Sequence, residues 1–305
     1  MPGSPPRPLV LFATSAGTAQ LTEDDRLFAG ALRRRGVDVC GAVWDDAAVD
    51  WARADIAIVR STWDYHLRRD EFLAWAGRIA AEGVLHNELP LLRWNSHKGY
   101  LAQLSAKGIA TIDTVFVARE SAAGEPGGAD VTALARMHGW HEIVVKPAVS
   151  AAAYETRRFA PGEWNAAQAH LARLARAGDV MLQPYLAGLG ARGELSLVFA
   201  RGAFSHAVRR RSALVDEHAI PTSAPAEAPA PAIHFAERVL AAALAVAPEA
   251  SGQPPLYARV DLAEVAPDAS VLLELELIEP SLFLLHAPHA AETFADAAVR
   301  MLLQD

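Results

Sequence analysis

The sequence has very little cysteine and no long apolar run, and each absence excludes a class of protein. Its single cysteine, Cys40, cannot form a disulfide within the chain, which excludes a disulfide-stabilised domain and predicts a reducing, cytoplasmic compartment. The first eight residues lack the apolar core of a signal peptide. No stretch of about 18 uncharged apolar residues follows, so we expect no membrane partner.

Positive charge is also in short supply. The chain has 28 lysines and arginines against 36 aspartates and glutamates, a formal net charge of −8. Nucleic-acid surfaces are normally basic, so we expect no nucleic-acid partner. With 305 residues, 52% of them hydrophobic, the chain is long enough for two or three lobes with buried cores. The composition is compatible with a monomer and with a homodimer.

Strand-like and helix-like segments alternate over the first ninety residues. We expect strands over 9–14, 37–43, 56–62 and 84–87, and helices over 22–36 and 70–81. Thr22 and Asp25 form a plausible capping pair for the first helix, and Gly36 is a plausible stop. This alternation predicts a small parallel α/β domain over residues 1–92.

The rest of the chain predicts two further lobes, over residues 93–185 and 186–305. The expected elements of the first are a helix over 96–106, a strand over 111–117, a hairpin over 142–159, a helix over 165–177 and a strand over 180–186. Those of the second are strands over 193–200, 203–211, 256–265 and 270–280, with helices over 233–246 and 288–303. The segment 212–232 is rich in proline and alanine without periodicity, which predicts a mobile loop or disorder.

The predicted strand over 270–280 carries two carboxylates, Glu274 and Glu276, among residues that otherwise favour burial. Two positions apart on a strand, they share one face at about 6–7 Å. At that distance they repel by about 2.5 kcal/mol at an effective dielectric near 20. Arg259 and Asp261 on the preceding strand are also two apart, and a hairpin would bring all four together. Such carboxylates suit Mg²⁺, which shares its remaining positions with phosphates. The alternative is a solvated sheet face.

Lysine is scarce, which draws attention to Lys98 in "NSHKGYL" and Lys146 in "VVKPAVS". A buried Lys146 needs an anionic partner such as a phosphate, and a turn of small residues could bring backbone N–H groups close to it. The alternative is an edge lysine that reaches solvent, and the absence of glycine in 148–153 weakens the phosphate interpretation. Farther along, "MLQPYL" (181–186) ends an apolar strand at Pro184, where unpaired backbone groups could contact an adenine edge.

Taken together, these motifs resemble the ATP-grasp ligases, particularly the glutathione synthetase and ribosomal-protein glutamate ligase branch. Their order matches: a lysine at a helix start, lysine-proline on a strand, a hinge strand, a downstream glutamate, then "RVD" and "LELELIEPS". The resemblance extends from about residue 9 to 303. It implies an α/β (α+β) ATP-grasp fold, in which an N-terminal parallel α/β domain precedes two α+β lobes that clasp ATP.

The resemblance also implies a function for each matched residue. The nucleotide would be held by Lys98 and Lys146 at the phosphates, the hinge around Gln183, Tyr185 and Leu186 at adenine, and Glu194 at the ribose. The Mg²⁺ ligands would be Asp261, Glu274 and Glu276, although many relatives have asparagine at the last position. Arg259 matches the arginine that stabilises the transferred phosphoryl group and the later tetrahedral intermediate.

"IVRSTWDY" (58–65) and "EPSLFL" (279–284) are typical of one bacterial subgroup, which is similar to the D-cycloserine synthetases. These cyclo-ligases close O-ureido-D-serine into a ring with ATP. An intermolecular amino-acid or peptide ligase is an alternative, because the segment 210–232 departs from the glycine-containing basic stretch usual in the subgroup. A small-molecule kinase of the same fold and a nucleotide-binding regulator without turnover are further alternatives.

We expect a small amino-acid-like substrate to bind the loop near 60–64, the strand near 209–211 and the segment 279–281. The predicted contacts are Arg60, Ser61, Thr62, Asp64, Arg209, Glu279 and Ser281. Arg60 and Arg209 could pair a substrate carboxylate. For Arg60, a salt bridge to a neighbouring lobe is the alternative.

Overall fold

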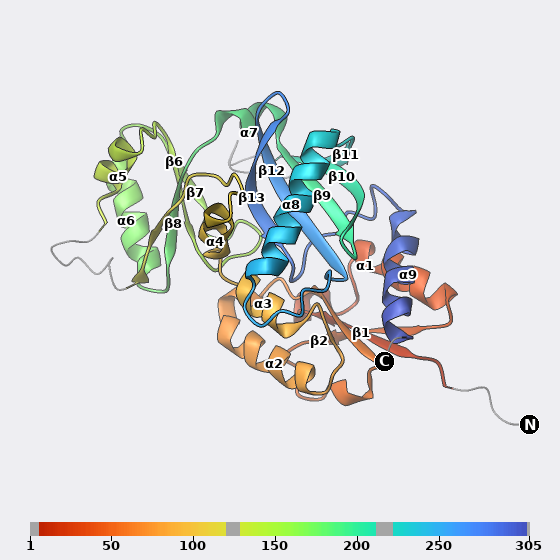
Figure 1. The fold of residues 1–305 in the computed structure, drawn as a ribbon. Helices are drawn as coiled ribbons and strands as arrows, with labels where there is room; N and C mark the ends of the chain where they lie inside the picture. The colour runs from red at the N-terminus through yellow and green to blue at the C-terminus, as the bar shows by residue number, and fades with distance from the viewer. Residues whose placement is uncertain (1–5, 120–128, 212–221, 304–305) are drawn as a thin grey trace, which may run out of the picture.

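A parallel sheet forms the N-terminal part of the molecule (Figure 1). The computed structural model describes residues 6–119, 129–211 and 222–303. The first sheet has the order β2-β1-β3-β4, with β1 Leu9–Thr14, β2 Asp38–Val43, β3 Ile56–Ser61 and β4 Leu85–His86. All its pairings are parallel, as the strand–helix alternation predicts. Its helices are α1 Glu23–Arg34 and α2 Arg69–Ala81, and its short 3₁₀ turns are η1 Ala16–Thr18, η2 Trp51–Arg53 and η3 Tyr65–Arg68.

The two ends of the chain share one core on this sheet. Helix α1 begins where the sequence predicts, because the Thr22 hydroxyl accepts a hydrogen bond from the Asp25 N–H at 3.0 Å. The C-terminal helix α9 (Ala290–Leu302) packs against α1, and the rings of Phe28 and Phe294 lie 6.0 Å apart (Figure 1). Residues near both termini therefore bury the same apolar surface.

A second, antiparallel sheet has the order β5-β8-β6-β7. Its strands are β5 Val115–Val117, β6 Ile143–Pro147, β7 Arg157–Phe159 and β8 Val180–Pro184, and α5 Val131–Met137 and α6 Trp164–Ala175 pack on it. Two helices precede it, α3 Leu89–Asn95, which the sequence did not predict, and α4 Tyr100–Ala106. The predicted strand over 111–117 is too long, because Thr111 makes an isolated bridge to Leu272 and only 115–117 join this sheet.

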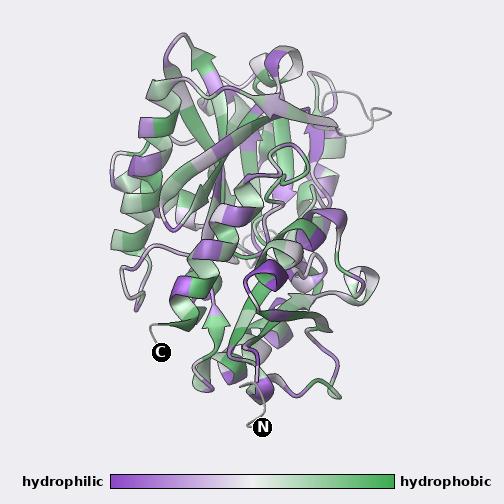
Figure 2. Ribbon diagram, turned by 90° about the vertical axis from the view of Figure 1, so that its right-hand side faces the viewer, coloured by the Kyte–Doolittle hydropathy of each residue, from purple (hydrophilic) through white to green (hydrophobic). Residues whose placement is uncertain are grey.

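The third sheet, also antiparallel, has the order β11-β10-β9-β12-β13. Its strands are β9 Glu194–Ala200, β10 Ala203–Arg211, β11 Thr222–Ala226, β12 Tyr257–Ala266 and β13 Ala269–Glu276. Helix α7 (Ala187–Arg192) precedes β9, and α8 (Ala230–Val246) covers one face of the sheet (Figure 1). Figure 2 shows that the interior strands are predominantly hydrophobic.

The prediction of a mobile loop or disorder over 212–232 is wrong for its second half. Residues 222–226 form β11 and α8 begins at Ala230, whereas 212–221 lie outside the described residues. Proline is tolerated in an edge strand, and Pro225 lies in the edge strand β11. The predicted strand over 270–280 ends earlier, at Glu276. Within the described ranges, no helix is long and apolar enough to cross a membrane.

Candidate active site

A pocket of about 570 Å³ lies between residues of all three sheets. The N-terminal sheet contributes Trp63 and Tyr65 from the loop after β3, and the second sheet contributes Lys146 on β6 and the loop over 150–156. The third sheet supplies the charged wall, with Glu194, Arg210, Arg259, Glu274 and Glu276 on four neighbouring strands. The volume of the pocket is within the range typical of small-molecule sites.

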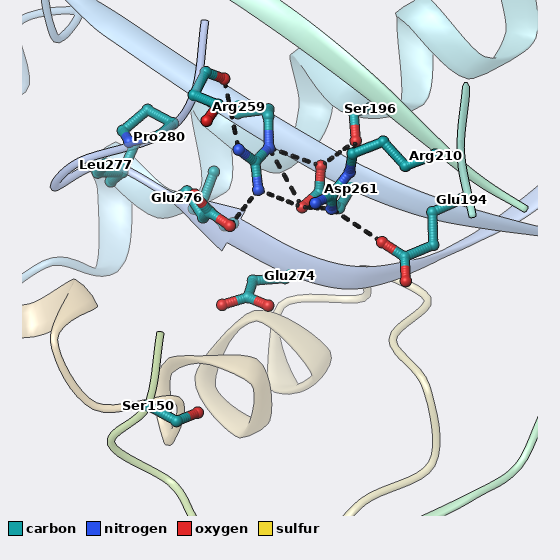
Figure 3. Close-up of polar contacts among 12 residues, drawn as sticks. Ser150, Glu194, Ser196, Arg210, Arg259, Asp261, Glu274, Glu276, Leu277 and Pro280 are labelled. Atoms are coloured by element: carbon teal, nitrogen blue, oxygen red, sulfur yellow. Dashed lines mark hydrogen bonds and ion pairs between the residues drawn. The ribbon is translucent and has the colours of Figure 1, made fainter. Parts of the chain in front are cut away.

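The hairpin predicted for the acidic strand is confirmed. Strands β12 and β13 pair antiparallel with Asp261 opposite Glu274 and Arg259 opposite Glu276. This register places all four charged side chains together on neighbouring strands (Figure 3). The repulsion that the sequence raised between Glu274 and Glu276 is offset because each carboxylate has a cation beside it.

Arg259 occupies the centre of this charged group. Its Nε donates to Asp261 Oδ1 and its Nη2 to Asp261 Oδ2, both at 2.9 Å, and Nη2 also contacts Glu276 (Figure 3). A second arginine, Arg210, donates from Nη2 to Asp261 Oδ2 at 2.7 Å and to Glu194 Oε2 at 2.8 Å. Asp261 is therefore buried beneath two guanidinium groups and does not itself line the pocket.

The carboxyl groups here differ in how easily they ionise. Burial favours the protonated form of Asp261, but Arg210 and Arg259 outweigh it and lower its pKa. Burial raises the pKa of Glu276 to about 7, because Arg259 compensates only part of the desolvation. Burial likewise raises the pKa of Glu194. A pKa of about 7 places Glu276 close to half ionisation at neutral pH.

Lys98 joins the acidic strand to the loop after β6. It lies in the turn between α3 and α4, two residues before α4 begins at Tyr100, whereas the sequence predicts it at the start of a helix over 96–106. Its Nζ donates to the Ser150 carbonyl at 2.6 Å and lies 3.0 Å from Glu274 Oε1. Burial opposes ionisation of Glu274, but Lys98 and then Lys146 outweigh burial and lower its pKa.

Lys146 is different, because no described residue lies within hydrogen-bond or ion-pair distance of its Nζ. It is half-buried on β6 and lines the pocket. Burial lowers its pKa, the expected effect of desolvating an ammonium group that lacks a close counter-ion. The arrangement favours an anion in the pocket as its partner. It contradicts the alternative of a lysine that reaches solvent at a strand edge.

The loop after β6 brings its backbone to the pocket without any glycine. Ala152 and Ala153 line the pocket with φ of 49° and 56°, and Glu155 has φ of 52°. This left-handed conformation is one that glycine usually adopts. Alanine therefore adopts here the backbone conformation that a glycine would favour. The missing glycine, which weakened the phosphate interpretation at the level of sequence, is therefore no obstacle.

Only two of the seven predicted substrate contacts, Glu279 and Ser281, line the pocket. Arg60 is buried instead, with its Nε donating to Asp25 Oδ1 at 2.8 Å and its Nη2 to the Pro280 carbonyl at 3.1 Å. Arg60 does form a salt bridge, but its partner Asp25 lies on α1 of the same N-terminal domain and not on a neighbouring lobe. Its contact with the C-terminal part of the chain is the hydrogen bond to the Pro280 carbonyl. The predicted contact of Arg60 with substrate does not agree with the pocket, because Arg60 is buried away from its lining and two of its three guanidinium nitrogens already donate to protein groups.

The other predicted residues of that loop also lie outside the pocket. Ser61 and Thr62 are buried, and Asp64 accepts a hydrogen bond from Trp44 Nε1 at 3.0 Å and from Arg68 Nη2 at 3.1 Å. The loop presents the aromatic residues between and after them, Trp63 and Tyr65. The sequence gives no signal that distinguishes these neighbours, because the loop has no strand or helix periodicity.

Strand β10 lines the pocket with Arg210 and with Arg211 at its end, but not with the predicted Arg209. Arg209 pairs with Glu264 and lies outside the pocket, whereas Arg210 is paired with Glu194 across the strands and lines it. Successive strand residues point to opposite faces, so a shift of one position exchanges the two arginines. The alternation of side chains along β10 identifies Arg210 as a pocket residue only when its pairing with Glu194 on β9 is known.

The predicted adenine-binding hinge does not line the pocket. Gln183 is buried and donates from Nε2 to Thr114 Oγ1 at 2.9 Å. The backbone N–H of Tyr185 already donates to the Glu142 carbonyl at 2.9 Å, and the Arg158 guanidinium lies 3.7 Å from the Tyr185 ring centroid. Leu186 begins the turn into α7. An adenine contact at these residues remains a prediction.

The residue types predicted to bind Mg²⁺ are present, but they do not form a closed ligand set. Across the described ranges, no group of three or more histidine, cysteine, aspartate or glutamate side chains is arranged to hold a metal ion. Asp261 and Glu276 are engaged by Arg259, and Glu274 by Lys98. Glu274 and Glu276 nevertheless line the pocket with carboxylate oxygens, the donors that Mg²⁺ prefers, so these two residues fit the ion.

Comparison with known proteins identifies the family. Residues 10–87 match the family model of the D-cycloserine synthetase DcsG N-terminal domain. The chain is 33% identical over 288 residues to the cycloserine biosynthesis protein DcsG of Streptomyces lavendulae, covering 89% of this chain and 91% of that protein. A crystal structure of D-cycloserine synthetase DcsG superposes with a TM-score of 0.88 at 32% identity, covering 96% of this chain and 99% of that chain.

The fold extends to more distant ligases. A D-alanine–D-alanine ligase from Bacillus anthracis complexed with ATP superposes with a TM-score of 0.67 at 14% identity, covering 97% of each chain. At that identity the likeness shows the shared fold alone. The family match, the similarity over most of the chain and the shared fold agree. This chain belongs to the D-cycloserine synthetase family of ATP-grasp ligases, enzymes that form C–N bonds with ATP.

Proposed function

We propose that this ATP-dependent ligase closes O-ureido-D-serine into D-cycloserine. The similarity to DcsG over 89% of the chain carries the proposal. The pocket supports it, because Lys146, which has no counter-ion among the described residues, and the charged group around Arg259 line the same pocket. A phosphorylated donor and a small amino acid can meet there.

In this proposal the nucleotide phosphates bind the basic part of the pocket and the metal ion binds the acidic part. Lys98 and Lys146 bind the ATP phosphates, with backbone N–H groups of the loop over 150–156 beside them. Glu194 binds the ribose, and the hinge around Gln183, Tyr185 and Leu186 binds adenine. Glu274 and Glu276, with Asp261 behind them, hold Mg²⁺. The ion supplies neutralisation of the negative charge that spreads over the transferred phosphoryl group.

The chemistry requires positioning and charge neutralisation rather than a protein nucleophile. A carboxylate oxygen of the substrate accepts the terminal phosphoryl group, and ADP leaves. The nitrogen of the substrate's O–NH group then attacks the activated carbon: the C–N bond forms, the C–O bond to phosphate breaks, and the nitrogen loses its proton. Phosphate departs with the electron pair. D-Cycloserine lacks the ureido carbonyl, so hydrolysis of the carbamoyl group must release carbon dioxide and ammonia.

Arg259 is the residue that we assign to these steps. Its guanidinium is held by Asp261 and Glu276, so it is already oriented before a ligand arrives. Its Nη1 lies 3.4 Å from the Ser281 carbonyl, which fixes the remaining side of the group. A preorganised cation stabilises developing negative charge without having to reorganise during the reaction.

The test is turnover with a single amino acid. The protein is incubated with ATP, Mg²⁺ and O-ureido-D-serine, and ADP, phosphate and the product mass are measured. We expect equimolar ADP and phosphate together with D-cycloserine. A requirement for a second amino acid would instead show an intermolecular ligase, and a stable phosphorylated product without free phosphate would show a kinase. If ATP binds but no ADP forms with any amino acid tested, the protein would be a nucleotide-binding regulator without turnover.

A further inference from the structure

One carboxyl group in the pocket has no cation beside it among the residues that the structure describes. Four glutamates line the pocket, and three of them are paired: Glu194 with Arg210, Glu274 with Lys98, and Glu276 with Arg259. The fourth, Glu279, is 8% exposed, and no described cation lies within ion-pair distance of it. Its carboxyl has a hydrogen bond from its own backbone, but no charge to balance it. A nearly buried carboxylate that lines a binding pocket without a cation beside it is unfavourable unless a ligand compensates it.

The surroundings of Glu279 explain why no protein group neutralises it. The charged and titratable groups that act on its carboxyl are Glu276, Lys98 and Glu274, and those on which it acts include Tyr65 and Tyr257. Burial and then the neighbouring Glu276 raise the pKa of Glu279 to about 8. Lys98, the cation that acts on it, is already engaged by Glu274 and Ser150.

Resting on the proposed function, we propose that Glu279 binds the α-ammonium group of the substrate. The ligand brings the cation that the pocket lacks, and a charge-assisted hydrogen bond to a desolvated carboxylate is strong. The location suits an α-amino acid. Glu279 lies between Glu276, which contacts Arg259, and Ser281, whose carbonyl accepts a hydrogen bond from Arg259. Because the ammonium and carboxylate groups of an α-amino acid are attached to the same carbon, anchoring the first directs the second toward Arg259.

This assignment makes Glu279 a specificity residue for amino acids. An acid of the same shape without the α-amino group would leave the Glu279 carboxyl unpaired and should bind poorly. The neighbouring glutamates cannot substitute, because their cations are fixed by the protein. Among the described residues, Glu279 makes no hydrogen bond or ion pair with Arg259 or with Lys98 and Lys146, the lysines proposed to bind phosphate. The affinity for nucleotide should therefore not depend on Glu279.

The experiment compares two ligands on matched variants at pH 8. Binding of O-ureido-D-serine and of its des-amino analogue, 3-(ureidooxy)propanoic acid, is measured by calorimetry with Mg²⁺ and a non-hydrolysable ATP analogue present. We expect the wild type to prefer the amino compound by about tenfold to a hundredfold, the range of a charged hydrogen bond. Glu279→Gln should bind both compounds alike, Glu279→Asp should keep part of the preference, and the surface control Glu292→Gln should match the wild type.

Two outcomes overturn the inference: Glu279→Gln that retains the full preference, or a wild type that binds both compounds equally. Unchanged affinity for the ATP analogue shows that the Glu279 variants are folded. The proposed reaction is judged separately, by turnover. A wild type that prefers the amino compound yet releases no ADP supports the ammonium site and refutes the reaction. A wild type that binds neither compound refutes both.

Discussion

Lys98 and Lys146 share a proposed function, yet the structure predicts opposite effects on stability when each is replaced by methionine. Lys98 pairs with Glu274 at 3.0 Å and donates to Ser150, so Lys98→Met leaves a carboxylate without its nearest cation. Breaking a buried pair costs about 3–5 kcal/mol, and the 29% exposed Glu274 side chain reduces this to about 2–3 kcal/mol. Lys146 has no such pair within the described residues. Lys146→Met removes a desolvated ammonium group and should stabilise the ligand-free protein by about 1 kcal/mol.

The measurement is urea denaturation of both variants and the wild type at pH 7.5 without nucleotide, alongside ADP release in the turnover assay. We expect both variants to lose turnover, Lys98→Met to unfold at lower urea and Lys146→Met at equal or higher urea. Restored stability in Lys98→Met combined with Glu274→Gln would identify the unpaired carboxylate as the cause. Equal destabilisation by both single variants would refute the reasoning, because it would mean that Lys146 is compensated in the ligand-free protein.

Three further predictions use other contacts. Arg210→Gln should lower kcat/KM by about 100-fold, whereas Arg209→Gln, which faces away from the pocket, should change it by less than about fivefold; equal effects would contradict the assigned strand faces. The buried Asn87 side chain donates from Nδ2 to the carbonyls of Tyr257 at 3.0 Å and Leu277 at 2.8 Å, and its Oδ1 accepts from the Leu256 N–H at 2.7 Å. Asn87→Ala should therefore lower the free energy of unfolding, measured by urea denaturation, by about 2–4 kcal/mol. A loss of less than about 1 kcal/mol would show that these three hydrogen bonds do not stabilise the contact between the N-terminal and C-terminal parts of the chain. The Glu279 pKa is raised from 4.5 to about 8, so its stabilising contribution is complete below about pH 4.5 and is lost as pH rises through 8. Melting temperature should therefore decrease over that window in the wild type and decrease less in Glu279→Gln; parallel curves would count against the raised pKa.

The local chemistry of the sequence predicted the elements that depend on near neighbours. Thr22 and Asp25 sufficed to place the start of α1, because a helix cap is formed within four residues. The spacing of Arg259, Asp261, Glu274 and Glu276 sufficed to predict one face of a hairpin, because strand parity is fixed by the backbone. Both predictions are confirmed.

Features that depend on distant partners were not predicted correctly. The sequence does not reveal the partners of Arg60, because Asp25 and Pro280 are 35 and 220 positions away. It predicts Arg209 rather than Arg210, because the register of β10 against β9 cannot be read along the chain. The strand β11 was missed because its proline is tolerated only at a sheet edge, and the sequence does not show which strands are edges.

The sequence by itself determined which charged residue types share a strand face, and through its motifs the family and its chemistry. Tertiary structure decided which of those charges are already neutralised. Three cations from separate segments, Lys98, Arg210 and Arg259, pair with the carboxylates of Glu274, Glu194, Asp261 and Glu276. Two charged residues of the pocket, Lys146 and Glu279, have no ion-pair partner among the described residues. The physical reason is that electrostatic compensation depends on distance in space and on burial. Spacing along the chain fixes neither beyond a single strand or helix.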